Sequence, residues 1–117
     1  MVAIKSTLVG LIVTALATSI AADTCVVGST FHRDISTGGG RIYVERGGKK
    51  LCDFDNKVDC GRNVVEKCKD LKHAVSFYTE CSWGKFESCS VDYGNTERDG
   101  EPEQFSHASS CKVEFPC

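Results

Sequence analysis

The sequence predicts an α+β fold, in which an antiparallel sheet of about four strands is covered by one main helix. Segments with a polar–apolar alternation of period two lie on both sides of a single segment with the period of a helix. Strands and helix are therefore segregated along the chain, which is typical of α+β domains. We expect one small disulfide-rich domain, residues 23–117.

Five segments have the composition or the alternation of strands. The first contains two valines, a threonine and a phenylalanine, which favour strands, and inward-facing apolar residues alternate with polar ones in the second and the last. The third is short and fits the returning strand of a hairpin, because a glycine pair precedes it. The segments are 25–31, 41–46, 51–54, 85–93 and 110–115.

The helix is predicted over residues 64–77. Asn63 precedes it as a candidate N-cap, and Glu66 follows three residues later, which is the spacing of a capping box. Apolar side chains then recur at positions 64, 68, 71 and 75, which form one face of a helix. Since Cys68 is on that face, we expect a disulfide to join the helix to the sheet.

Two finer predictions concern the segment after the helix. In 85–93, alternation places Cys89 and Val91 on the inward face and Phe86 on the outward face. The range 94–103 is mostly acidic and contains no aliphatic residue, so we predict an exposed loop there.

Residues 1–22 have the pattern of a cleaved secretory signal. Lys5 precedes a run of 17 residues without a charge, and small residues occupy positions 19 and 21 near the end of this run. The alternative is a membrane anchor, but the run is at the lower limit for spanning a bilayer, about 17–25 residues. We therefore predict cleavage near Ala22 and an extracellular protein.

All eight cysteines lie in the predicted mature part of 95 residues. Their density and even number predict four disulfides and no free thiol in an oxidising compartment. A zinc site is disfavoured because at least five residues separate any two cysteines. Eight cysteines allow roughly 100 pairings, so the connectivity stays open. They are Cys25, Cys52, Cys60, Cys68, Cys81, Cys89, Cys111 and Cys117.

The mature part is only mildly acidic, with 13 basic and 16 acidic residues and a formal charge of −3. A nucleic-acid binder would carry a basic stripe, so we expect no nucleic-acid partner. We also expect no stable membrane insertion, no metal and no cofactor, and a monomeric protein. The expected partner is a host or competitor protein or a cell-surface carbohydrate.

An acid–base site is one candidate for chemistry. Tyr43 and Glu45 point to the same side of their predicted strand, and with His107 they would supply groups of the kind that small secreted ribonucleases use. No motif surrounds these residues, and a solvent-facing strand commonly carries such side chains. We therefore assign no catalytic residue and favour a non-enzymatic protein.

The candidate binding residues are aromatic: Trp83, Phe86 and Tyr93. Aromatic side chains dominate the anchors of interfaces, although they also dominate small cores. Trp83 precedes Gly84 in a predicted turn, so we expect it to be partly exposed.

The signal 1–22, the short mature part, the eight cysteines and the C-terminal cysteine together resemble the small secreted cysteine-rich proteins of filamentous fungi. This broad class includes host-directed effectors, killer-toxin-like proteins and antimicrobial proteins. The chain departs from hydrophobins, since it has no adjacent cysteine pair, and from cationic antifungal proteins in its charge. The resemblance implies an effector-like protein that acts by binding. The alternatives are a killer-toxin-like or antimicrobial protein and a small ribonuclease-like hydrolase.

Overall fold

The computed structural model describes residues 24–32 and 40–117, and these ranges contain strands and no helix. The predicted signal segment 1–22 lies outside the described residues. The strands are β1 (Thr24–His32), β2 (Ile42–Arg46), β3 (Lys49–Asp53), β4 (Asn63–Glu66), β5 (Val75–Ser82), β6 (Lys85–Tyr93), β7 (Thr96–Asp99), β8 (Glu101–Gln104) and β9 (Ala108–Pro116).

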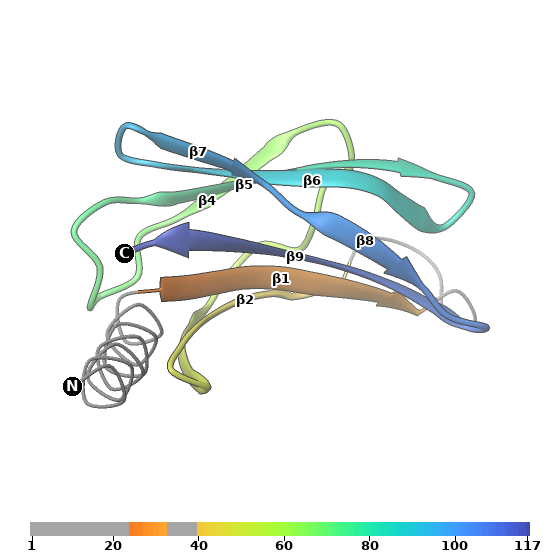
Figure 1. Ribbon diagram of the computed structural model, residues 1–117. Helices are drawn as coiled ribbons and strands as arrows, with labels where there is room; N and C mark the ends of the chain where they lie inside the picture. The colour runs from red at the N-terminus through yellow and green to blue at the C-terminus, as the bar shows by residue number, and fades with distance from the viewer. Residues whose placement is uncertain (1–23, 33–39) are drawn as a thin grey trace, which may run out of the picture.

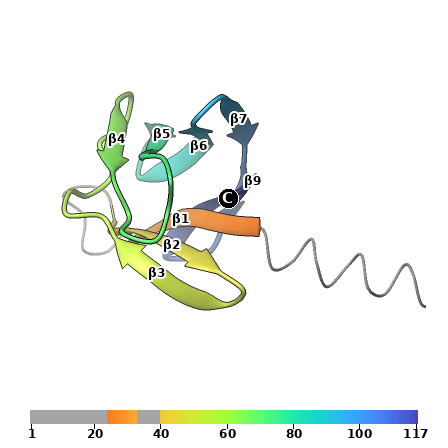
Figure 2. The ribbon, with the colours of Figure 1, turned by 90° about the vertical axis from the view of Figure 1, so that its left-hand side faces the viewer.

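The strands form two antiparallel sheets that lie one above the other (Figure 1). The five-stranded sheet has the order β3-β2-β1-β9-β8, and the four-stranded sheet has the order β4-β5-β6-β7. Figure 2 shows the same two layers from one end. The prediction of an α+β fold is therefore wrong, because the described part of the protein is a disulfide-rich β-sandwich.

The core lies between the two sheets. Inward-facing side chains of β1, β2 and β9 meet those of β5 and β6, and they include fully buried valine and phenylalanine residues. Burying one such side chain stabilises the fold by about 1.5–3 kcal/mol. Among the buried residues are Val27, Val44, Val113 and Phe115 from one sheet, and Phe77, Val91 and Phe86 from the other.

The segment predicted as a helix forms β4, a loop and the beginning of β5. Asn63, the expected N-cap, pairs with Tyr78, and Glu66 pairs with Val75. The positions of the predicted helical face are buried, but Val64 and Val75 face inward from two paired strands, while the other two lie in the loop between them. Long-range pairing of the β-branched and aromatic residues of β5 outweighs the local helical spacing.

All eight cysteines form disulfides, which confirms the predicted number. The expected link from Cys68 to a sheet exists, but it starts from a loop and not from a helix, and it ends at Cys52 in β3. Cys89–Cys111 joins β6 to β9 and thus one sheet to the other. The remaining pairs are Cys25–Cys117 and Cys60–Cys81.

The acidic range 94–103 is not a loop, because it forms β7 at the edge of one sheet and β8 at the edge of the other. Edge strands expose most of their side chains, which explains the lack of aliphatic residues. The chain changes sheets at Gly100, whose N–H donates a 2.9 Å hydrogen bond to the carbonyl of Cys89. A Cβ on Gly100 would lie 2.2 Å from the carbonyl oxygen of Lys112, so only glycine fits this crossing.

Phe86 points into the core, whereas the alternation of its strand places it outward. Cys81 pairs with Phe86 but Glu80 pairs with Ser88, so Glu87 is an extra residue in β6. This β-bulge reverses the alternation. Cys89 and Val91 are buried as predicted, and the ring of Phe86 also turns inward, with its centroid 4.5 Å from that of Phe31.

Candidate binding site

Trp83 is the most exposed large apolar side chain in the described part of the chain, with 94% of its surface accessible to solvent. With Gly84 it forms the turn between β5 and β6, where Ser82 pairs with Lys85. The exposure confirms the expectation for Trp83. An isolated exposed apolar side chain is common in proteins, but an almost fully exposed indole leaves a large apolar surface in water.

The backbone of Trp83 adds a second unfavourable feature. Its φ angle is 54° and that of Gly84 is 71°, so both central residues of the turn are in the left-handed region. A two-residue hairpin turn of this type favours asparagine and glycine. Among the described residues, Trp83 is the only non-glycine residue with positive φ. The left-handed conformation costs such a residue roughly 1–2 kcal/mol.

Two other hairpins of the same protein provide an internal comparison. The turn between β2 and β3 uses Gly47 and Gly48, with φ angles of 60° and 79°. The turn between β6 and β7 begins with Gly94, whose φ is 59°. Of these three turns, only the one between β5 and β6 places a bulky side chain at such a position, and backbone strain of this kind is concentrated at functional sites.

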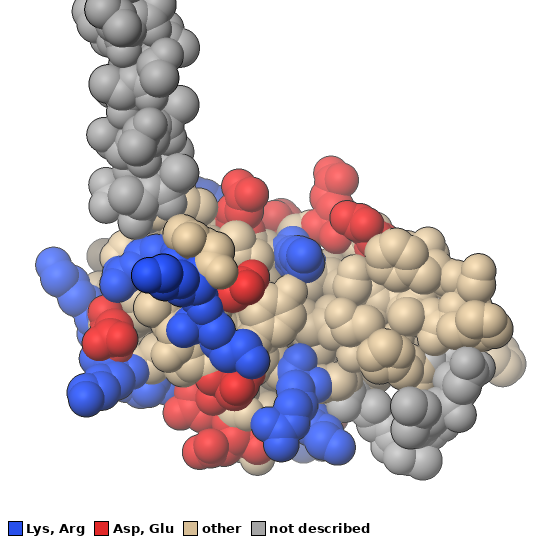
Figure 3. All heavy atoms as spheres, turned by 90° about the horizontal axis from the view of Figure 1, so that it is seen from below, with Lys and Arg blue, Asp and Glu red and all other residues tan. Residues whose placement is uncertain are grey.

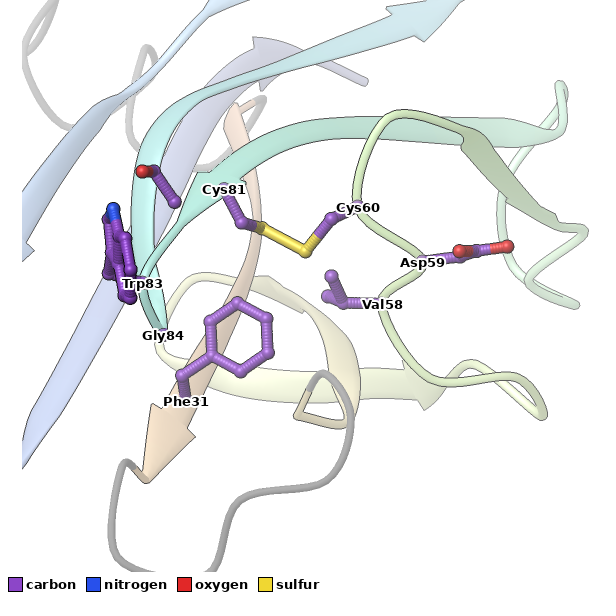
Figure 4. Close-up of a pocket in the computed structure, with 8 residues that line it drawn as sticks. Phe31, Val58, Asp59, Cys60, Cys81, Trp83 and Gly84 are labelled. Carbon is purple, nitrogen blue, oxygen red and sulfur yellow. A yellow bond between two sulfur atoms is a disulfide. The ribbon is translucent and has the colours of Figure 1, made fainter.

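Two hollows lie on either side of Trp83. The first has a volume of about 300 Å³, and Figure 4 shows the ring of Phe31 near the disulfide in this hollow, with Trp83 at its margin. The second has a volume of about 450 Å³ and lies against β6 and β8. Besides Trp83 and Ser82, the first is lined by Phe31, Val58, Asp59, Cys60, Cys81 and Gly84, and the second by Lys85, Phe86, Glu87, Pro102 and Gln104.

The turn that carries Trp83 is fixed to the opposite sheet. The N–H of Phe86 donates a 2.9 Å hydrogen bond to Ser109 Oγ, and Gln104 Nε2 donates a 2.9 Å hydrogen bond to the carbonyl of Phe86. The strand β7 pairs only with Ser90 to Tyr93 and does not reach Phe86. The side chains of Ser109 and Gln104 therefore supply the hydrogen bonds that a neighbouring strand would otherwise give to the backbone of β6. The indole is therefore displayed from a rigid base.

A second exposed aromatic side chain lies at the same end of the molecule. Phe105, in the turn between β8 and β9, is 52% exposed and follows Gln104 of the second hollow. In Figure 1 this turn and the turn between β5 and β6 lie at the same end of the sandwich. Figure 3 shows that the charged side chains on the outer face of the five-stranded sheet gather toward the opposite end. We call Trp83, Phe105 and the linings of both hollows the Trp83 surface.

Phe86 and Tyr93, the other candidate binding residues, are 1% and 6% exposed and belong to the core. The hydroxyl of Tyr93 accepts a 3.1 Å hydrogen bond from the N–H of Lys72, and its ring lies 5.2 Å from that of Phe115. Sequence reasoning missed Phe105. Its signal was present, since it is the one apolar residue other than proline between Gly94 and His107.

The structure does not bring the acid–base candidates together. The hydroxyl of Tyr43 lies over Gly28, 2.9 Å from where a Cβ would be, on the outer face of the five-stranded sheet. Gly28, beneath the Tyr43 ring, pairs with Lys112. His107 precedes Lys112 by five residues, which corresponds to roughly 17 Å along a strand and places His107 far from Tyr43. Glu45 lines a hollow with neither Tyr43 nor His107 among its lining residues.

The described residues contain no group of three or more histidine, cysteine or acidic side chains placed to hold a metal ion. They also contain no helix with the length and hydropathy needed to cross a bilayer. No protein-family model matches the chain, and neither a curated protein nor a solved structure matches it. The geometry of the Trp83 surface is therefore the basis on which a function can be assigned.

Proposed function

We propose that this protein is secreted and acts by binding an extracellular target through the Trp83 surface. The four disulfides support the extracellular part of the proposal, because such bonds form and persist in oxidising compartments. The signal-like pattern of residues 1–22 supports it as well.

The observation that carries the binding role is the strained and exposed position of Trp83. Glycine or asparagine would suit the backbone of this turn better, and a polar side chain would suit its exposure better. Tryptophan is enriched among the residues that dominate binding energy in interfaces. A ligand that covers the indole would offset the cost of exposing it.

We favour a binding function over catalysis because the acid–base candidates do not lie in one site. A ribonuclease-like mechanism needs a base and an acid within hydrogen-bond reach of one reacting group. Tyr43 and Glu45 lie on the outer sheet face, while His107 lies in the turn between β8 and β9. The resemblance to small secreted fungal proteins supports a role directed at a host or a competitor.

The test compares two variants of the oxidised mature protein. Trp83→Asn removes the indole and suits the turn, whereas Val65→Asn changes a side chain that is 56% exposed on β4, away from both hollows. Each protein is incubated with intact cells and with extracellular fluid of candidate hosts, and the retained fraction is measured. We expect Trp83→Asn to lower retention at least tenfold and Val65→Asn to leave it unchanged. Equal retention of Trp83→Asn and the native protein would refute the proposal.

A further inference from the structure

We infer that the ligand of the Trp83 surface is a neutral oligosaccharide chain, which crosses the indole and places neighbouring sugar rings in the two hollows. This inference rests on the proposed binding function and names the class of its ligand. Three features of the surface support it: an apolar and a polar hollow next to the indole, the position of the hollows, and the charge of their linings.

The two hollows beside Trp83 differ in their linings. The first is mainly apolar, because Phe31, Val58 and the Cys60–Cys81 disulfide line it, and Figure 4 shows the carboxylate of Asp59 pointing away from it. The second contains the polar and charged residues Lys85, Glu87 and Gln104, whereas the core of a protein–protein interface is depleted of charged residues. A flat aromatic ring with an apolar hollow on one side and a polar hollow on the other suits a ligand that has an apolar face and a polar rim.

A pyranose ring has that chemistry. Its C–H groups form a weakly positive apolar face, which is attracted to the negative face of an aromatic ring. Its hydroxyl groups both donate and accept hydrogen bonds around the rim. Glu87 would accept from hydroxyls and Lys85 would donate to them, and hydrogen bonds to charged groups are the stronger ones.

The hollows lie on both sides of the indole, and each has room for a small ring-shaped group, with volumes of about 300 and 450 Å³. A chain of sugars that stacks one ring on Trp83 would therefore extend its neighbours into both. Because hydrogen bonds to Ser109 and Gln104 fix the turn, little flexibility is lost when the ligand binds.

The charge of the linings favours a neutral chain. The second hollow contains one carboxylate, Glu87, and one ammonium group, Lys85, and the carboxylate of Asp59 at the margin of the first lies 3.9 Å from Nε of Arg62. This balance does not attract an anionic polysaccharide, a nucleic acid or an anionic lipid, all of which need clustered cations.

The experiment uses the indole itself as the reporter, because Trp83 is the single tryptophan of the chain. The oxidised mature protein is titrated with hexasaccharides of β-1,3-glucose, β-1,4-glucose, β-1,4-N-acetylglucosamine and β-1,4-mannose, and separately with phosphatidylcholine vesicles. We expect a saturable blue shift of the fluorescence with at least one hexasaccharide and none with vesicles. Glu87→Gln should weaken that binding at least threefold, and Val65→Asn should not change it.

The outcomes separate the two proposals. If no hexasaccharide shifts the emission, while vesicles or a host protein are retained in a manner that depends on Trp83, the glycan inference is wrong and the binding function stands. If retention of every probe is the same for the native protein and Trp83→Asn, both are wrong. Glycan binding that is insensitive to Trp83→Asn would also overturn the inference.

Discussion

The backbone N–H of Phe86 and the side-chain oxygen of Ser109 form a 2.9 Å hydrogen bond that joins the two sheets. Ser109 is completely buried, and it belongs to β9 of the opposite sheet. The bond lies three residues from Trp83, so the position of the indole depends on a contact between sheets as well as on the hairpin itself.

Ser109→Ala is expected to destabilise the protein by about 1–3 kcal/mol, because it leaves the buried N–H of Phe86 without its acceptor. Urea unfolding measures the change. Ser106→Ala, in the exposed turn between β8 and β9, is the control and should change stability by less than about 0.5 kcal/mol. Equal stability of Ser109→Ala and the native protein would show that the bond does not fasten the hairpin.

Trp83→Asn is expected to stabilise the fold by up to about 1 kcal/mol, because asparagine tolerates the left-handed backbone that Trp83 adopts. The thermal midpoint should therefore rise while binding is lost. Val65→Asn is the control, since it removes an exposed apolar side chain from extended backbone. A lower midpoint for Trp83→Asn would mean that the indole makes stabilising contacts and that its exposure is not a cost.

The sequence allowed prediction of the strands that alternate toward a core and of the exposed Trp83, because both patterns are local. The prediction of a helix was wrong because β4 is only four residues long and is defined by its pairing with β5. The sequence near Val64 gives no sign of that pairing. The strands in 94–103 were missed because edge strands need no apolar face. The bulge at Glu87 depends on how β6 pairs with β5, and the disulfides join cysteines at least 16 residues apart, so the alternation within one segment contains neither.

The hydrogen bond between Tyr78 and Glu80 leads to a prediction about the pKa of Tyr78. The phenol donates a 2.8 Å hydrogen bond to the carboxylate of Glu80, and this bond raises the pKa of Tyr78, with smaller contributions from burial and from the negative charge. Because the folded pKa lies above the unfolded one, any stabilisation from the bond is present below the unfolded pKa and is lost as pH rises through the folded pKa. Glu80→Ala should lower the pKa of Tyr78, measured by NMR of its ring carbons, whereas Glu87→Ala should not. An unchanged titration in Glu80→Ala would contradict the assigned cause.

Gly100→Ala is expected to destabilise the protein by at least about 3 kcal/mol, because a Cβ would lie 2.2 Å from the carbonyl oxygen of Lys112 and 2.8 Å from Cys89 Sγ. These neighbours are backbone and a disulfide, so neither moves without separating the sheets. The matched control is Gly48→Ala, which has positive φ but no atom within 4 Å of the added Cβ, and it should cost only about 1 kcal/mol. Equal losses in denaturant unfolding would show that the close approach of β6 and β9 does not make glycine necessary at the crossing between the sheets.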